Sequence, residues 1–260
     1  MPDTPSNLGS ILLPKERGGW SLALEPIALA LLVAPSAAGA ALAVAGVAGF
    51  FTRRPLKLAV TSPLSDSRRT CARRWAALFI CVVLAALAAS AALGPPHALW
   101  PLLVAVPFAA AFLWYDLRQA MRETQAELAG CIAFALLPAT FATLAGWPWR
   151  PAMGLAGLAL ARSVPTVLTI RTYLHVRKGL PGRASLAVAV AALAVIALAL
   201  LAAQRLVPWA APVLATLMLA RTAFLTTSCR PIYTARRLGI IEAVLGVFYV
   251  GTLALAYRLR

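Results

Sequence analysis

Acidic residues are scarce in this chain, and it has no long polar segment. Only 8 of its 260 residues are Asp or Glu, against 24 Lys and Arg, and 62% of all residues are hydrophobic. The mean hydropathy is +0.83. A water-soluble domain needs more polar surface than this composition supplies, which excludes an ordinary globular protein. The sequence therefore predicts an integral membrane protein.

Metal-ligating and nucleophilic motifs are also missing. The four cysteines, Cys71, Cys81, Cys131 and Cys229, form no CxxC pair, and the two histidines fall on opposite sides of the predicted membrane. No motif places a serine, cysteine or histidine beside a general base. We therefore expect no disulfide, no metal site and no cofactor, and we assign no catalytic residue.

Nine apolar stretches, separated by short polar breaks, fill the chain from Trp20 to Tyr257. Each comes near the roughly 20 residues that a helix needs to cross about 30 Å of hydrocarbon. Continuous Ala and Leu runs exclude the alternating pattern of barrel strands. The sequence predicts an all-α, polytopic membrane bundle of about nine transmembrane helices, with residues 1–19 as a cytoplasmic segment and 20–260 as one transmembrane domain. The expected spans are residues 20–35, 37–52, 75–93, 98–115, 126–145, 152–171, 185–203, 207–224 and 238–257.

Positive charge is distributed unevenly among the connections. Most Lys and Arg residues lie before the first span or after the second, fourth, sixth and eighth, and cytoplasmic loops retain such charge. The opposite side has only Arg150, Arg205, Arg258 and Arg260. We therefore predict that the N-terminus is inside and the C-terminus outside. The net charge of +16 is spread over loops that face anionic headgroups, so membrane lipids are the expected partners and nucleic acid is not.

Charged side chains at membrane depth are the first functional candidates, because each costs about 2.5–3.5 kcal/mol on insertion scales. Arg162 is the deepest, about 15 Å from either surface at 1.5 Å per residue. It begins a polar stripe on one face of its helix, formed by Arg162, Thr166, Thr169, Tyr173 and Arg177. Two interpretations stay open: Arg162 pairs with a carboxylate to fix packing, or these groups line a cytoplasm-facing cavity for an anionic or protonatable ligand.

The candidate ligand-binding residues share membrane depth or a place at the predicted cytoplasmic ends of the helices. They are Glu25, Arg53, Arg54, Lys57, Arg122, Glu127, Arg162, Thr166, Thr169, Arg171, Tyr173, Lys178 and Glu242.

Three segments resemble the YwiC-like family of bacterial membrane proteins. They are residues 14–20 (Pro-Lys-Glu-Arg-Gly-Gly-Trp), residues 162–168 continuing to Arg171, and residues 238–242 followed by Gly246. The resemblance to this family implies no particular activity. The resemblance implies the bacterial cytoplasmic (inner) membrane as the location.

The layout is also similar to that of the UbiA superfamily of intramembrane prenyltransferases, which have nine helices and functional loops after the second, fourth and sixth. Short matches include residues 54–56, Tyr115 with Arg122, and Arg171-Thr172. Those enzymes use two Asp-rich motifs to hold magnesium on a prenyl diphosphate, and hard cations need several carboxylate oxygens. Here Asp66 stands alone and residues 171–183 contain no acid. Magnesium-dependent prenyl transfer is therefore not expected.

Our leading hypothesis is a UbiA-like bundle that binds a lipid-soluble or phosphate-bearing, isoprenoid-like molecule in a cytoplasm-facing cavity, with bases in place of an Asp–Mg site. If the protein is an enzyme, an atypical prenyl-transfer-like activity is expected. One alternative is a secondary transporter of a small anion. The other is a membrane scaffold or assembly factor that uses small-residue helix faces such as residues 37–49 to bind a protein partner that the sequence does not identify.

Overall fold

The computed structural model describes residues 19–63, 67–118, 123–227 and 230–260. Within those ranges the chain forms α-helices, one short 3-10 helix and no strand, which confirms the all-α prediction. Residues 1–18, Asp66, Arg122 and Cys229 lie outside the described residues.

Each predicted span corresponds to one α-helix. The helices are α2 (Gly19–Val33), α3 (Ala37–Thr61), α4 (Ser67–Leu93), η1 (Pro96–Leu99), α5 (Trp100–Leu117), α6 (Thr124–Leu144), α7 (Trp149–Arg177), α8 (Ala184–Ala203), α9 (Ala210–Thr226) and α10 (Ala235–Arg258).

The largest differences from the predicted bounds are in α3 and α4. Helix α3 continues past residue 52 to Thr61, and α4 begins at Ser67 instead of residue 75. Hydrophobicity predicts where the chain crosses the membrane and falls where the basic residues begin, but Arg, Lys and Leu are all good helix formers. The bases that were expected in a loop, Arg53 and Lys57 among them, therefore lie on helices.

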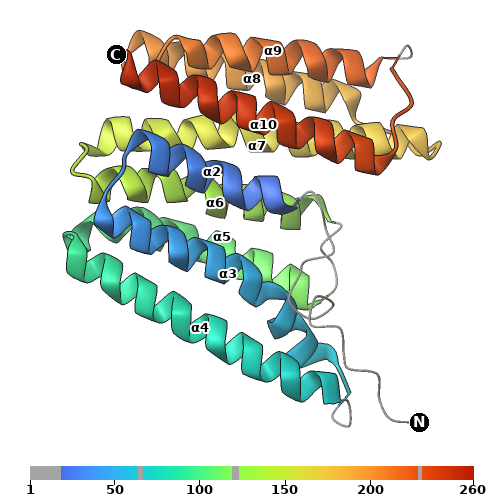
Figure 1. The fold of residues 1–260 in the computed structure, drawn as a ribbon. Helices are drawn as coiled ribbons and strands as arrows, with labels where there is room; N and C mark the ends of the chain where they lie inside the picture. The colour runs from blue at the N-terminus through green and yellow to red at the C-terminus, as the bar shows by residue number, and fades with distance from the viewer. Residues whose placement is uncertain (1–18, 64–66, 119–122, 228–229) are drawn as a thin grey trace.

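The helices run side by side in three groups (Figure 1). Helices α2, α6 and α7 form the middle, with α8, α9 and α10 on one side and α3, α4 and α5 on the other. Helix α6 packs on α5 and α7, while α2 packs on α6 and α10. Alanines that expose no surface, such as Ala30, Ala139 and Ala152, let these backbones approach closely.

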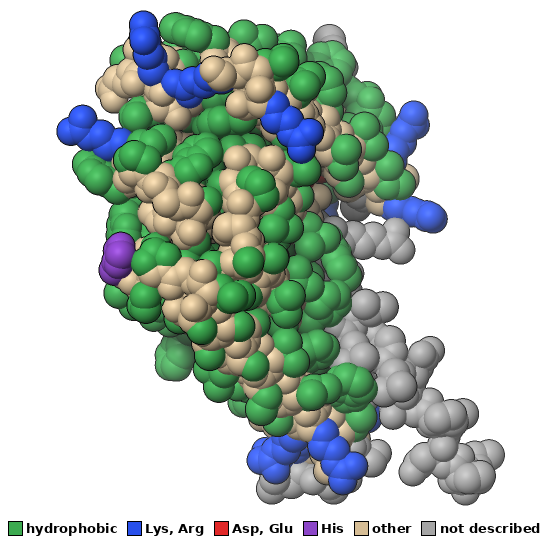
Figure 2. Space-filling model, turned by 60° about the vertical axis from the view of Figure 1, so that its left-hand side comes forward, with side chains coloured by type: hydrophobic (Ala, Val, Ile, Leu, Met, Phe, Trp, Pro, Cys, Tyr) green, Lys and Arg blue, Asp and Glu red, His purple; other side chains and the backbone are tan. Residues whose placement is uncertain are grey.

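Because consecutive helices alternate in direction, α2 begins at one end of the bundle and α10 ends at the other (Figure 1). The end where α2 begins, here called the basic end, holds most of the described Lys and Arg. The opposite end holds Arg150, Arg205, Arg258 and Arg260. On the face in Figure 2, hydrophobic side chains cover the middle and Lys and Arg lie at the margins.

In the part of the chain that the structure describes, six helical segments are long and apolar enough to cross a membrane: Arg68–Leu93, Pro96–Leu117, Thr124–Leu144, Trp149–Arg177, Ala184–Ala203 and Arg236–Arg258. Large apolar side chains point outward from the bundle, among them Leu84, Leu103 and Val247. Water would be a poor solvent for such a surface, whereas lipid tails suit it. The chain is thus a helical membrane bundle; the count of nine spans and the orientation remain predictions.

Three helices end in the same type of turn, in which a residue with positive φ follows the helix. Gly146 after α6 has φ 82° and Gly179 after α7 has φ 74°. Arg205 after α8 has φ 58°, and all three turns close with the same pair of backbone hydrogen bonds. Glycine adopts this conformation freely, but an L-residue with a side chain costs roughly 1–2 kcal/mol there. Arg205 is therefore retained at a position where glycine would be unstrained.

Candidate functional site

Four carboxylates in the described chain form ion pairs with bases on other helices: Glu25, Asp116, Glu127 and Glu242. They form two clusters and a separate pair. The central cluster consists of Glu25, Arg162, Thr166, Arg221 and Glu242. The basic-end cluster consists of Arg53, Lys57 and Asp116, and the separate pair is Arg171 with Glu127.

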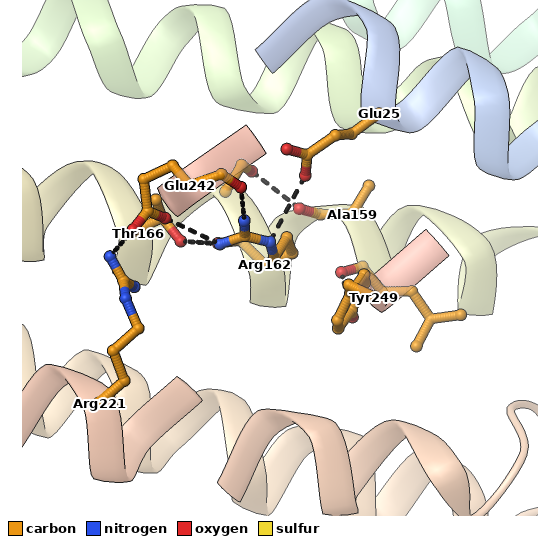
Figure 3. A network of polar contacts seen from close by, with 9 residues as sticks. Glu25, Ala159, Arg162, Thr166, Arg221, Glu242 and Tyr249 are labelled. Carbon is orange, nitrogen blue, oxygen red and sulfur yellow. Dashed lines mark hydrogen bonds and ion pairs between the residues drawn. The ribbon is translucent and has the colours of Figure 1, made fainter. Parts of the chain in front are cut away.

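The central cluster surrounds Arg162, which lies near the middle of α7 and is only 5% exposed. Its Nη1 donates to Thr166 Oγ1 at 2.6 Å and to Glu242 Oε2 at 3.4 Å, and its Nη2 donates to the Glu242 carbonyl oxygen at 3.1 Å. Its Nε lies 3.4 Å from Glu25 Oε2. Figure 3 shows the guanidinium between the two carboxylates, with Arg221 reaching Glu242 from α9. The cluster thus joins α2, α7, α9 and α10 with two positive and two negative charges.

The two carboxylates are held unequally. Glu242 engages both of its oxygens, one with Arg162 and one with Arg221. Glu25 pairs through one oxygen only, and its buried Oε1 has no hydrogen-bond partner among the described residues. The Glu25 carboxylate also lies against Gly246 of α10, in the space that a Cβ atom would occupy. Gly246 therefore makes room for Glu25 beside Arg162.

We expect Gly246→Ala to lower the free energy of unfolding by about 1–3 kcal/mol, since the added methyl must displace Glu25 from its ion pair. Thermal unfolding in detergent measures the change. Gly251→Ala is the matched control, because Gly251 lies on the same helix and a Cβ atom there meets nothing within 4 Å. Equal melting temperatures for the two variants would show that Glu25 moves aside without cost.

The basic-end cluster is built on Asp116, which lies at the end of α5 and is 4% exposed. Arg53 donates to Asp116 Oδ2 through Nε at 3.1 Å and Nη2 at 3.0 Å, and Lys57 Nζ donates to Oδ1 at 3.0 Å. The Arg53 guanidinium also lies over the Phe112 ring, 4.4 Å from its centroid. One carboxylate thus orients two cations one helical turn apart on α3, and the cluster has a net charge of +1.

The basic-end cluster and the Arg171–Glu127 pair are connected through α5 and α6. The Phe112 ring beneath Arg53 also covers Gly130 of α6, where a Cβ atom would lie 2.8 Å from the ring. One turn earlier on α6, Glu127 Oε2 accepts a hydrogen bond from Arg171 Nη1 of α7 at 2.9 Å. Helices α3 and α7 therefore present bases that are oriented by carboxylates of α5 and α6 at the same end of the bundle.

The structure brings together several predicted residues. Arg162 meets both Glu25 and Glu242, so the expected single carboxylate partner becomes two. Thr166 completes this cluster. Arg171 pairs with Glu127, which sequence reasoning had selected separately.

The other predicted residues lie elsewhere. Thr169 Oγ1 shares a hydrogen bond of 2.9 Å with Thr222 of α9. Tyr173 donates through its hydroxyl to the Pro231 carbonyl oxygen and accepts from the Tyr233 N–H, both at 2.7 Å, and so fixes the connection into α10. Lys178 is exposed at the end of α7, and Arg54 is partly exposed on α3. Arg122 lies outside the described residues.

Sequence reasoning missed Asp116 and Arg221. Asp116 directly follows an expected span, and in a chain with so few acids this position was a usable signal. Arg221 lies inside the expected span 207–224 but was grouped with the cytoplasmic bases. Among the described residues, no three His, Cys, Asp or Glu side chains come together as metal ligands. The carboxylate-oriented side chains of Arg53, Lys57 and Arg171 are chemically suited to hydrogen-bond an anion.

Comparison with known proteins shows a family match. The sequence model for the YwiC-like protein family matches residues 13–142. This range contains the segment 14–20, Glu25 and the whole basic-end cluster, whereas residues 162–168 and 238–242 lie beyond it. No curated protein and no solved structure matches the chain.

Proposed function

The chain belongs to the YwiC-like family, and we propose that it binds a lipid-soluble molecule with an anionic, phosphate-bearing head at the basic end of its bundle. The observation that supports this most is the basic-end cluster, in which a nearly buried Asp116 orients Arg53 and Lys57. A phosphate head could accept hydrogen bonds from both of these cations.

The chemistry of the two cations suits such a head. A guanidinium presents a planar fork of donors that matches phosphate, and an ammonium adds a compact charge. The side chains of Arg53 and Lys57 are 12% and 28% exposed, so both are largely desolvated yet reachable. Arg171, oriented by Glu127, adds a further base across α6. Arg and Lys side chains would then hold the phosphate head, as magnesium holds the prenyl diphosphate in the UbiA superfamily. We propose that this bundle shares the layout of that superfamily.

An apolar tail suits the surroundings of this head site. Near Arg53 the rings of Phe51 and Phe79 are partly exposed and stack with their centroids 6.1 Å apart, over the buried rings of Phe50 and Phe112. A long isoprenoid chain buries a large apolar area against such rings and against lipid. We therefore propose an isoprenoid-like ligand, with the cytoplasmic leaflet as its source.

The experiment is thermal stabilisation of the purified protein by a long isoprenyl diphosphate, with magnesium and with EDTA, and by inorganic diphosphate. We expect stabilisation that persists in EDTA and requires the tail. Arg53→Ala and Lys57→Ala should each weaken binding about tenfold or more, because a charge-assisted hydrogen bond is worth about 1.5–3 kcal/mol.

The matched control is Arg183→Ala, which removes an exposed base at the same end but outside the cluster. Absence of stabilisation in both buffers would contradict the proposed ligand class. Equal effects of Arg53→Ala and Arg183→Ala would exclude the basic-end cluster as its site.

The central cluster favours a second candidate, secondary transport of a small anion. An arginine near the middle of a membrane helix, shared by two carboxylates, is typical of substrate and proton pathways. Uptake of a labelled anion by proteoliposomes, lost in Arg162→Lys, would support this candidate.

The scaffold alternative has less support. Its small-residue face includes Gly39 and Gly46, but a Cβ atom at Gly39 would meet Phe141 of α6 and one at Gly46 would meet Ile27 of α2. These glycines therefore serve packing inside the bundle.

A further inference from the structure

A cavity of about 480 Å³ lies at the opposite end of the bundle, far along the helices from the basic end. It is formed by the end of α8, the turn into α9 and the end of α10. Its walls include Val207, Pro208, Trp209 and Leu259, together with the two arginines Arg205 and Arg260. An apolar hollow with two cations at its edge is chemically different from the lipid-facing surface around it.

The two arginines stand out because this end has few bases. Among the described residues, only Arg150, Arg205, Arg258 and Arg260 lie there, and two of these line one cavity. Arg260 donates to the backbone carbonyl oxygen of Arg205, which ties the chain terminus to the α8–α9 turn. No described Asp or Glu pairs with either guanidinium. The cavity therefore has a local excess of positive charge.

The backbone of Arg205 gives an independent indication. Its φ of 58° is in the left-handed region, at a turn position that Gly146 and Gly179 occupy after α6 and α7. An arginine is strained here, whereas glycine would satisfy the turn without strain. Strain retained at a cavity edge points to a role for the side chain, because backbone outliers concentrate at binding sites.

We propose that this cavity binds the headgroup of an anionic phospholipid from the leaflet that surrounds the opposite end. Arg205 and Arg260 would bind the phosphate, since guanidinium groups match phosphate oxygens. Trp209, which is 64% exposed, would lie at headgroup level, where indole rings are enriched. Leu259, which is largely exposed, would contact the start of the acyl chains. This site does not depend on the proposed isoprenoid site, which lies at the other end.

The test compares thermal stabilisation by phosphatidylglycerol, phosphatidylcholine and glycerol phosphate in detergent, and counts retained lipids by native mass spectrometry. The wild-type protein should retain and be stabilised by phosphatidylglycerol more than by phosphatidylcholine. Glycerol phosphate, which has no acyl chains, separates a lipid site from a site for free phosphate. Stabilisation by glycerol phosphate alone at equal concentration would overturn the lipid assignment.

Arg205→Gly is the decisive variant. Relief of the backbone strain should maintain or raise the stability of the lipid-free protein, whereas loss of the guanidinium should lower its affinity for the lipid. Without lipid, its melting temperature should equal that of the wild-type protein or exceed it by about 2 °C. Its affinity for phosphatidylglycerol should fall about tenfold. Arg260→Ala should lose affinity similarly, whereas Arg150→Ala should not, since Arg150 lies over the Trp149 ring at the same end but outside the cavity. Unchanged affinity in Arg205→Gly would overturn the proposal.

Discussion

Replacing Arg162 by methionine is expected to lower the free energy of unfolding by about 3–5 kcal/mol, which is typical when one partner of a buried ion pair is removed. Methionine fills a similar volume, so the loss would come from charge and hydrogen bonds. Arg162 Nε, Nη1 and Nη2 face Glu25, Glu242 and Thr166, and without them the Glu25 carboxylate has no cation beside it. Chemical or thermal unfolding in mixed micelles measures the effect.

The central cluster predicts a specific pattern of double variants. Adding Glu25→Gln to Arg162→Met should recover much of the lost stability, because the unpaired negative charge is removed with it. Adding Glu242→Gln should recover less, since Arg221 still pairs with Glu242. Simple additivity of Arg162→Met and Glu25→Gln would mean that the two side chains do not interact in the folded protein.

Asp116→Asn is expected to lower the free energy of unfolding by about 2–4 kcal/mol. Asp116 accepts three hydrogen bonds from Arg53 and Lys57, and hydrogen bonds to charged groups are the stronger kind. Asparagine keeps the shape but removes the negative charge between Arg53 and Lys57. The same variant should also weaken isoprenyl diphosphate binding, because Arg53 and Lys57 lose the group that orients them.

Glu123→Gln is the control for the effect of Asp116→Asn on stability. Glu123 is an exposed acid just before α6, and its side chain makes no capping hydrogen bond. Its replacement should change stability by less than about 0.5 kcal/mol.

In an Asp116→Asn background, Lys57→Met should restore part of the stability by removing one of two like charges. If Lys57→Met instead lowers the stability of the Asp116→Asn variant further, Lys57 stabilises the bundle through contacts other than the one with Asp116.

The helices were predictable because each depends on residues close together in the sequence. Hydrophobicity and Ala-rich runs located all nine described α-helices, although the polar ends of α3 and α4 were missed because hydrophobicity marks the membrane and not the helix. Local counting also predicts that Arg162 lies deep within its helix, and the structure has it near the middle of α7 and buried. Tyr173 belonged to that stripe, but its hydroxyl serves the backbone near Pro231 and Tyr233.

The sequence by itself determined that this protein is a helical membrane bundle with one strongly basic end, since composition and periodicity are local properties that the bilayer selects directly. Only the tertiary structure decided which charges meet. Arg53 and Asp116 are 63 residues apart and Arg162 and Glu242 are 80 apart. Such pairs depend on which helices pack side by side and on small details such as the missing Cβ of Gly246. In a low-dielectric interior every buried charge must have a partner, but many pairings satisfy that need, and packing selects one of them.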